Sequence, residues 1–133
     1  VERYNKTLEI ELRALSELAA GFIIPALEAQ IKQSGEALAV LRTQGAKASQ
    51  AKRLEAMEVS LETIIKEQTA LNSGLESLHQ QGSELEIMKT ISLKLTPLAH
   101  KLRTACDEAE KRIADNLWPL PKYREMLFLN SQA

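Results

Sequence analysis

Two histidines and a single cysteine are the residues of this chain best suited to catalysis or metal binding. His100 and Cys106 are six positions apart on a predicted helix, which places them on different faces, so we do not expect a Cys–His nucleophilic pair. Glu76 and His79 have the Glu-x-x-His spacing of a di-metal site in a helical bundle, but the sequence holds no second copy of that motif. The glycines stand apart from one another and form no phosphate-binding loop. The sequence therefore predicts no catalytic, cofactor-binding or metal-binding residue.

Composition excludes several other classes of function. The chain has 133 residues, enough for one domain, and 17 basic residues balance 18 acidic ones to a net charge of −1. Such a balance provides no field to attract nucleic acid or an anionic membrane, and 4% aromatic residues are too few for a base-stacking surface. No apolar run approaches the roughly 20 residues of a membrane span. The chain begins at Val1 without methionine, so we expect a fragment of a larger protein.

Three long helices are predicted from the apolar pattern, over about residues 1–42, 51–81 and 84–116. Good helix formers dominate the chain, and apolar residues recur in steps of three and four, which places them on one helical face. The three apolar stripes are Leu8, Leu12, Leu15, Ala19, Phe22, Ala26 and Ala29; Leu54, Met57, Leu61, Ile64, Leu71, Leu75 and Leu78; and Met88, Ile91, Leu95, Leu98, Leu102, Ala105, Ala109, Ile113 and Leu117. The fold class predicted is all-α, an elongated antiparallel bundle of three long helices.

Glycine, serine and proline mark the junctions of this bundle. Gly45 suits the end of the first helix, where a positive φ is common, and residues 43–50 form the predicted loop. Gly82 precedes a Ser83-x-x-Glu86 capping box that begins the third helix.

Two prolines and one glutamine lie inside the helical stretches. Pro25 predicts a kink or short break near residues 21–24, and Pro97 predicts either a kink in one long helix or a new helical segment capped by Thr96. Gln68, the polar member of the second stripe, indicates either a residue that sets the packing register or a ligand contact.

The last 17 residues, 117–133, differ from the helical bundle of residues 1–116. They contain three of the chain's five aromatic residues and two of its four prolines, which end the third helix. Because so much apolar surface is costly in water, we expect this tail to dock, either on the bundle itself or on another domain or subunit. The candidate docking residues are Trp118, Pro119, Pro121, Tyr123, Met126, Leu127 and Phe128.

Three segments resemble the C-terminal region of type III glutamine synthetases, the large bacterial glutamate–ammonia ligases. They are Arg3-Tyr4-Asn5-Lys6-Thr7-Leu8-Glu9-Ile10-Glu11, Ile23-Ile24-Pro25-Ala26-Leu27-Glu28-Ala29-Gln30, and Leu117-Trp118-Pro119-Leu120-Pro121-Lys122-Tyr123 continuing through Met126-Leu127-Phe128. The last segment is the specific one, and the resemblance spans essentially the whole chain.

The resemblance implies a parent enzyme that joins ammonia to glutamate, uses ATP with Mg²⁺ or Mn²⁺, lies in the cytoplasm and assembles as a dodecamer. Its catalytic and metal-binding motifs match no position in these 133 residues, so none is assigned here. The implied partners are the rest of that enzyme and neighbouring subunits, with no nucleic acid and no membrane. The alternative is a free-standing helical bundle that acts as a protein-interaction or sensor module.

Overall fold

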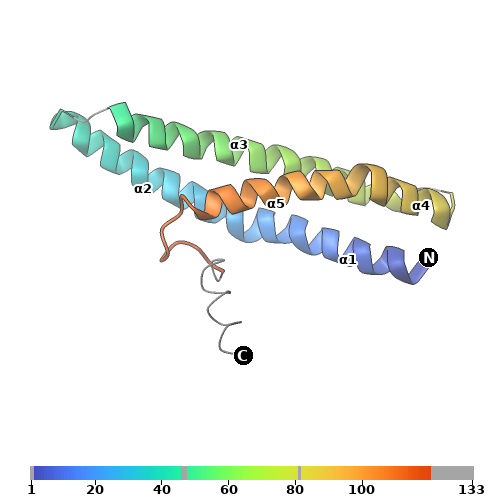
Figure 1. Cartoon of the computed structure of the whole chain (residues 1–133). Coiled ribbons are helices and arrows are strands. Elements are labelled where there is room, and N and C mark those ends of the chain that lie inside the picture. Colours follow the sequence, from blue (N-terminus) through green and yellow to red (C-terminus); the bar gives the residue numbers. More distant parts are fainter. Residues whose placement is uncertain (1, 46–47, 81, 121–133) are drawn as a thin grey trace.

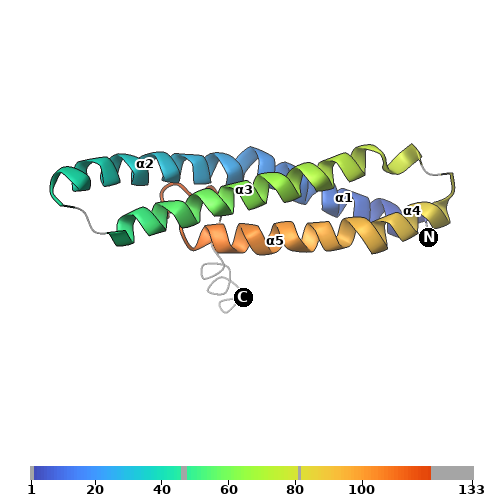
Figure 2. The same cartoon turned by 90° about the horizontal axis from the view of Figure 1, so that it is seen from above.

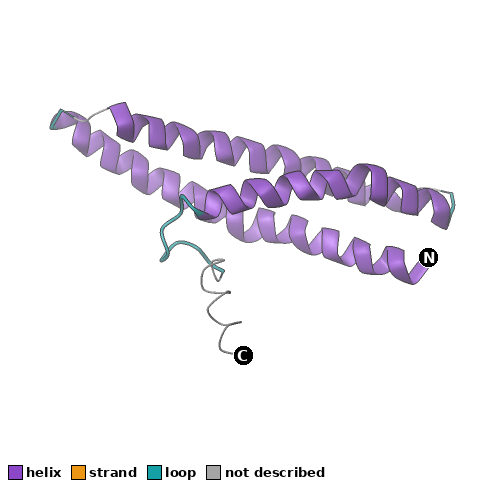
Figure 3. Ribbon diagram, viewed as in Figure 1, coloured by secondary structure: helices purple, strands orange, loops and turns teal. Residues whose placement is uncertain are grey.

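A computed structural model describes residues 2–45, 48–80 and 82–120. Those residues are almost entirely helical, and no strand occurs among them (Figure 3). The elements are α1 (Glu2–Leu18), η1 (Ala19–Ile23), α2 (Ile24–Thr43), α3 (Ala48–Glu76), η2 (Leu78–Gln80), α4 (Glu84–Thr90), η3 (Ile91–Leu95) and α5 (Thr96–Glu110). The short element η2 is a 3₁₀ turn, while η1 and η3 are π-helical turns. The predicted all-α class is confirmed.

The elements form three antiparallel rods (Figures 1 and 2). Helices α1 and α2 run along the molecule in one direction, α3 returns beside them, and α4 with α5 runs in the first direction again (Figure 1). Short connections of this kind force neighbouring helices to be antiparallel. The elongated antiparallel bundle of three long helices is therefore confirmed.

Both internal prolines follow a π-helical turn in an otherwise continuous rod. Proline lacks an N–H and its ring crowds the carbonyl four residues earlier, so an α-helical hydrogen bond is lost there. The residue directly before each proline instead makes an i→i−5 hydrogen bond. The Ile24 N–H donates to the Ala19 carbonyl, and the Thr96 N–H donates to the Ile91 carbonyl. The disturbance predicted at Pro25 and Pro97 is thus a π turn rather than a break, and Thr96 makes no side-chain cap.

The π turn before Pro25 moves the buried stripe of the first rod by one residue. A π turn holds one more residue than an α turn, so a sequence counted in steps of three and four loses its register there. Phe22 was expected on the buried face and is 52% exposed, whereas Ile23 is 2% exposed. Beyond the turn, Ala26 is buried as expected, Leu27 and Gln30 are buried as well, and the expected Ala29 is exposed.

The stripes of the second and third rods are buried as the spacing predicts. Ile64, Leu71, Leu75 and Leu78 from the second rod meet a cluster from the third rod. The largest fully enclosed side chains of the described core are Leu27, Met57, Ile64, Leu71, Leu75, Leu78, Ile91, Leu95 and Leu102. Burial of this apolar surface, at about 25 cal/mol per Å², is what holds the three rods together.

The capping signals at the junctions act as predicted, but the loop expected over residues 43–50 is shorter, because α2 runs to Thr43 and α3 begins at Ala48. Gly45 has a φ of +78° at the end of the first rod. The Ser83 Oγ accepts a hydrogen bond from the Glu86 N–H at 3.2 Å, and the Glu86 carboxylate reaches back to the Gly82 N–H at 3.0 Å. These bonds satisfy N–H groups that the first turn of α4 would otherwise leave without partners.

The predicted end of the third helix at residue 116 is wrong. Helix α5 ends at Glu110, and the Arg112 N–H then bonds to the Ala109 carbonyl in a tighter turn. A second turn places the Leu117 and Trp118 N–H groups on the Ala114 carbonyl. This early turn allows Ile113 and Trp118, 2% and 9% exposed, to enter the core.

Candidate functional site

Cys106 and the two histidines lie in three different settings. Cys106 is buried in the core, and burial, followed by the nearby Asp107 carboxylate, raises the pKa of its thiol to about 12. The thiolate is the nucleophilic form of cysteine, so the thiol at this position is unreactive at neutral pH. His100 is exposed on α5 and His79 is exposed on η2. Within residues 2–45, 48–80 and 82–120, no three His, Cys, Asp or Glu side chains gather to hold a metal ion.

His79 joins a charged cluster that ties α1 to the end of α3. Its Nε2 lies 2.8 Å from Glu9 Oε1, while Arg13 Nε donates to Glu9 Oε2 at 2.9 Å. The Arg13 Nη2 also donates to the Leu75 carbonyl at 3.2 Å, across the interface between the two helices. Burial alone would raise the pKa of the Glu9 carboxyl, but the hydrogen bonds and positive charges of His79 and Arg13 outweigh burial and lower it. The cluster therefore fastens α1 to the end of α3.

Gln68 bonds within the bundle. Its Nε2 donates to the Oγ of Ser16, which is 2% exposed, at 3.1 Å. The pair crosses from α3 to α1 and fixes their relative position, because a shift along the axis would leave buried polar atoms without partners. Of the two interpretations that the sequence left open, the one in which Gln68 sets the register accounts for this contact.

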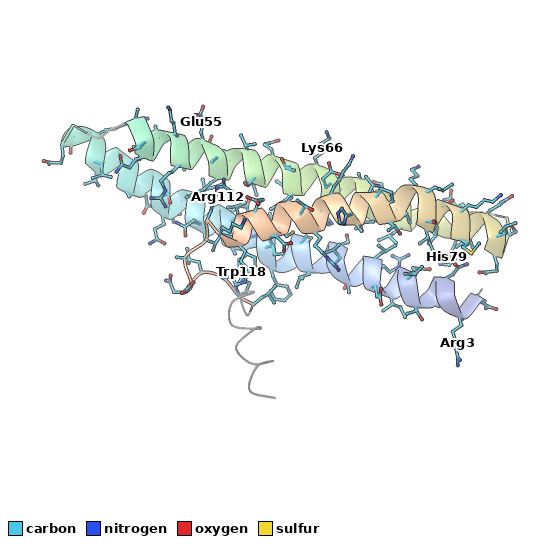
Figure 4. The ribbon with its side chains drawn as sticks, viewed as in Figure 1. Arg3, Glu55, Lys66, His79, Arg112 and Trp118 are labelled. Carbon is cyan, nitrogen blue, oxygen red and sulfur yellow. The ribbon has the colours of Figure 1, made fainter. Side chains whose placement is uncertain are left out.

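The strongest candidate for a functional surface is the segment that follows α5. Trp118 was predicted to dock, and its ring packs into the core cluster, with Leu117 and Leu120 half-buried beside it. Figure 4 shows Trp118 beneath the rods, near the point where the chain leaves the bundle. Pro119 is exposed. The other predicted docking residues, Pro121, Tyr123, Met126, Leu127 and Phe128, lie outside the described residues.

Gln30 holds this segment in place from α2. Its Oε1 accepts a hydrogen bond from the Ala114 N–H at 2.8 Å, and its Nε2 donates to Ser34 Oγ at 2.9 Å. Gln30 was not among the predicted functional residues, because the expected stripe ran through Ala29. The available signal was the Pro25 π turn, which moves the stripe forward by one residue and makes Gln30 a buried position. Gln30 and Trp118 together anchor the start of the tail on the chain's own bundle.

Trp118 also carries an unusual polar feature. Its indole Nε1 is buried, and no hydrogen-bond acceptor among the described residues reaches it. A buried donor without a partner costs about 1–3 kcal/mol, so the apolar burial of the ring must outweigh this penalty.

Grooves between helices are the other surface features of the described residues. One, with a volume of about 530 Å³, lies between α3 and α5, where Val59, Thr63, His100 and Thr104 line it. Ser60, Glu67, Lys101 and Glu108 line it as well, and the Thr104 hydroxyl donates to the His100 carbonyl rather than to the imidazole ring. None of the helices in the described ranges combines the length and apolar character needed to cross a bilayer.

The chain is, by its fold, a helical bundle module, and two known proteins resemble it. A type-3 glutamine synthetase from Dictyostelium discoideum is 26% identical over 135 residues, and a glutamine synthetase from Bacteroides fragilis is 27% identical over 139 residues. Each match covers 96% of this chain and 18% of the relative. No protein-family model matches. The resemblance to type III glutamine synthetases is therefore confirmed, and the chain spans less than a fifth of the length of these two relatives.

Proposed function

We propose that this chain is the C-terminal structural and assembly domain of a type III glutamine synthetase. The observation that carries the proposal is the match of nearly the whole chain to a small part of two glutamine synthetases. The fold supports a structural role, because the side chains of Gln68, His79 and Gln30 each bond to another rod of the bundle.

The activity belongs to the proposed parent enzyme and comes from parts outside this chain. That enzyme makes glutamine from glutamate, ammonia and ATP with Mg²⁺ or Mn²⁺, and it assembles in the cytoplasm as a dodecamer of identical subunits. This domain supplies helical surface that contacts the rest of the enzyme and its neighbours. The apolar residues that follow Trp118 in the sequence are the part of the chain that we assign to those contacts.

The proposal is tested by deleting this segment from the parent enzyme and measuring mass and glutamine synthesis separately. If the segment serves assembly, its deletion should lower the mass measured by light scattering below that of the intact oligomer. Glutamine synthesis should then persist only in subunits or smaller assemblies that still contain a complete active site. The isolated chain, given glutamate, ammonia, ATP and Mg²⁺, is expected to make no glutamine. Glutamine formation by the pure chain would refute the proposal.

The alternative is a free-standing helical module for protein interaction or sensing. The gene distinguishes the two proposals, because a long ligase sequence fused upstream of Val1 supports the enzyme domain. A reading frame that encodes this chain alone would favour the interaction module.

A further inference from the structure

The position of the third rod is filled along only part of the bundle. Helix α5 stops at Glu110, whereas α2 and α3 continue past it side by side, as both views show (Figures 1 and 2). Residues Thr104 and Glu108 of α5 line a groove with Ser60 and Val59 of α3, so α5 ends near the Met57 turn of that helix. We call the remaining two-helix part, residues 34–45 and 48–57, the hairpin tip.

The hairpin tip has a groove between its two helices. Leu38, Leu41, Leu54 and Met57 line this groove of about 180 Å³ together with the polar side chains of Ser34, Gln50 and Arg53. Met57 and Leu38 are 1% and 6% exposed, but Leu41 is 36% exposed and the adjacent Val40 is 64% exposed. A two-helix hairpin leaves one side of such a seam uncovered, and a third helix is the usual cover.

The charge of the hairpin tip differs in sign from that of the whole chain. The hairpin tip contains three basic side chains against the two acidic ones, Glu36 and Glu55, whereas the complete chain has a net charge of −1. The three basic side chains are all exposed, and in the described part of the chain none of them forms an ion pair; they are Arg42, Lys52 and Arg53. A groove lined by leucine and methionine side chains, with unpaired basic side chains beside it, favours an acidic occupant.

The same charge count argues against two other occupants. The last 13 residues of the chain, 121–133, contain Lys122 and Arg124 against Glu125, so this segment is itself basic. A second copy that paired through the same groove would bring two basic rims together, because a two-fold interface places identical patches opposite each other. Either occupant, the last 13 residues or a second copy, would place like charges opposite each other.

We propose that the hairpin tip binds an acidic amphipathic helix of a partner protein. The helix lies in the groove in line with α5, so that it completes the three-helix cross-section beyond Glu110. The large apolar residues of the partner helix, spaced three and four apart, cover Leu41 and Leu54. Its carboxylates face Arg42 and Arg53. The proposal does not depend on the glutamine synthetase assignment, since it rests on the groove and the charges of this chain alone.

The test uses two synthetic peptides of about four helical turns that share one leucine pattern. One carries glutamate at its remaining positions and the other carries lysine. Binding to the 133-residue chain is measured by fluorescence anisotropy, and the contact surface is located by amide hydrogen exchange. The protein variants are Arg42→Glu with Arg53→Glu, and a matched control, Lys66→Glu with Lys94→Glu, which makes the same charge change on exposed residues away from the tip.

We expect the glutamate peptide to slow hydrogen exchange in residues 34–45 and 48–57 and the lysine peptide to leave it unchanged. The Arg42→Glu, Arg53→Glu variant should bind the glutamate peptide roughly tenfold more weakly, while the control variant binds it about as well as the unaltered chain. Equal binding of both peptides, protection of another face, or equal binding by the two variants would overturn the proposal. A dimer of the chain that protects the tip without peptide would overturn it as well.

Discussion

Leu95 occupies the space that a β-carbon at Gly74 would need, so the π turn of the third rod packs against α3 at a residue without a side chain. Leu95 is fully buried, so moving its methyl group aside would disturb the packing of the core around it. Gly74 lies inside a helix of 29 residues, where glycine costs about 1 kcal/mol relative to alanine. Glycine is kept there because packing against Leu95 outweighs helix propensity.

The first prediction compares two glycines. We expect Gly74→Ala to destabilise the chain by about 1 kcal/mol or more, because overpacking against Leu95 costs about 1–3 kcal/mol and exceeds the gain in helix propensity. Gly35→Ala is the control, since a β-carbon there meets nothing within 4 Å, and it should stabilise the chain by up to about 1 kcal/mol. Urea unfolding of both variants measures the two signs, and equal stabilisation by both would contradict the close contact.

The second prediction concerns the anchor of the tail. Trp118→Ala should lower the free energy of unfolding by about 2–4 kcal/mol, because the ring leaves a cavity in the core cluster. Phe22→Ala is the control, since that ring is 52% exposed and its loss should change stability by less than about 0.5 kcal/mol. An unchanged midpoint for Trp118→Ala would show that the tail requires a partner to dock.

The third prediction is a pH dependence that Glu9 confers. The pKa of its carboxyl is lower in the folded chain than the ordinary value of 4.5. At a pH between the folded and unfolded pKa values, the folded state therefore binds fewer protons than the unfolded state. The stabilisation is complete above pH 4.5 and is lost as pH falls through the folded pKa. Urea unfolding between neutral and acidic pH should therefore show a stability difference from Glu9→Gln that shrinks on acidification. Glu17→Gln, an exposed change on the same helix, should show a smaller difference, and equal behaviour of the two variants would argue against the cluster.

The fourth prediction concerns the polar pair between α1 and α3. Ser16→Ala removes the acceptor of Gln68 and should cost about 1–3 kcal/mol, because the amide loses its partner in a partly buried site. Ser16→Ala combined with Gln68→Leu removes both polar groups and should recover much of that loss. A double-mutant cycle with the three variants measures the coupling, and strict additivity would mean that the hydrogen bond contributes nothing.

The fifth prediction concerns thiol reactivity. Cys106 is 6% exposed, and its thiol pKa is raised to about 12 by burial and by Asp107, so a disulfide reagent at neutral pH should modify it only when the chain opens. The modification rate should rise steeply in denaturant and follow the unfolding transition. Rapid modification of the native chain would show that the region around α5 opens far more often than this packing allows.

The tail was predicted only in part from the sequence. Its prolines and aromatic residues indicated a segment that docks, and Trp118 packs on the bundle. The place where the third helix ends was misjudged, because residues 111–116 carry no strong helix-breaking signal. The turn at Glu110 is favoured by the burial of Ile113 and Trp118 and by the bond from the Ala114 N–H to Gln30, a residue 84 positions away.

The sequence by itself determined the number of rods, their antiparallel order and the buried faces of the second and third, because an uninterrupted helix repeats its faces with a fixed period. It also located the Gly45 and Ser83 junctions, whose chemistry is local. Only the tertiary structure decided the faces beyond Pro25, the end of α5 and the partners of Gln30, Gln68 and Glu9. The physical reason is that a π turn changes the period by one residue, and contacts between rods choose among backbone states that differ little in local energy.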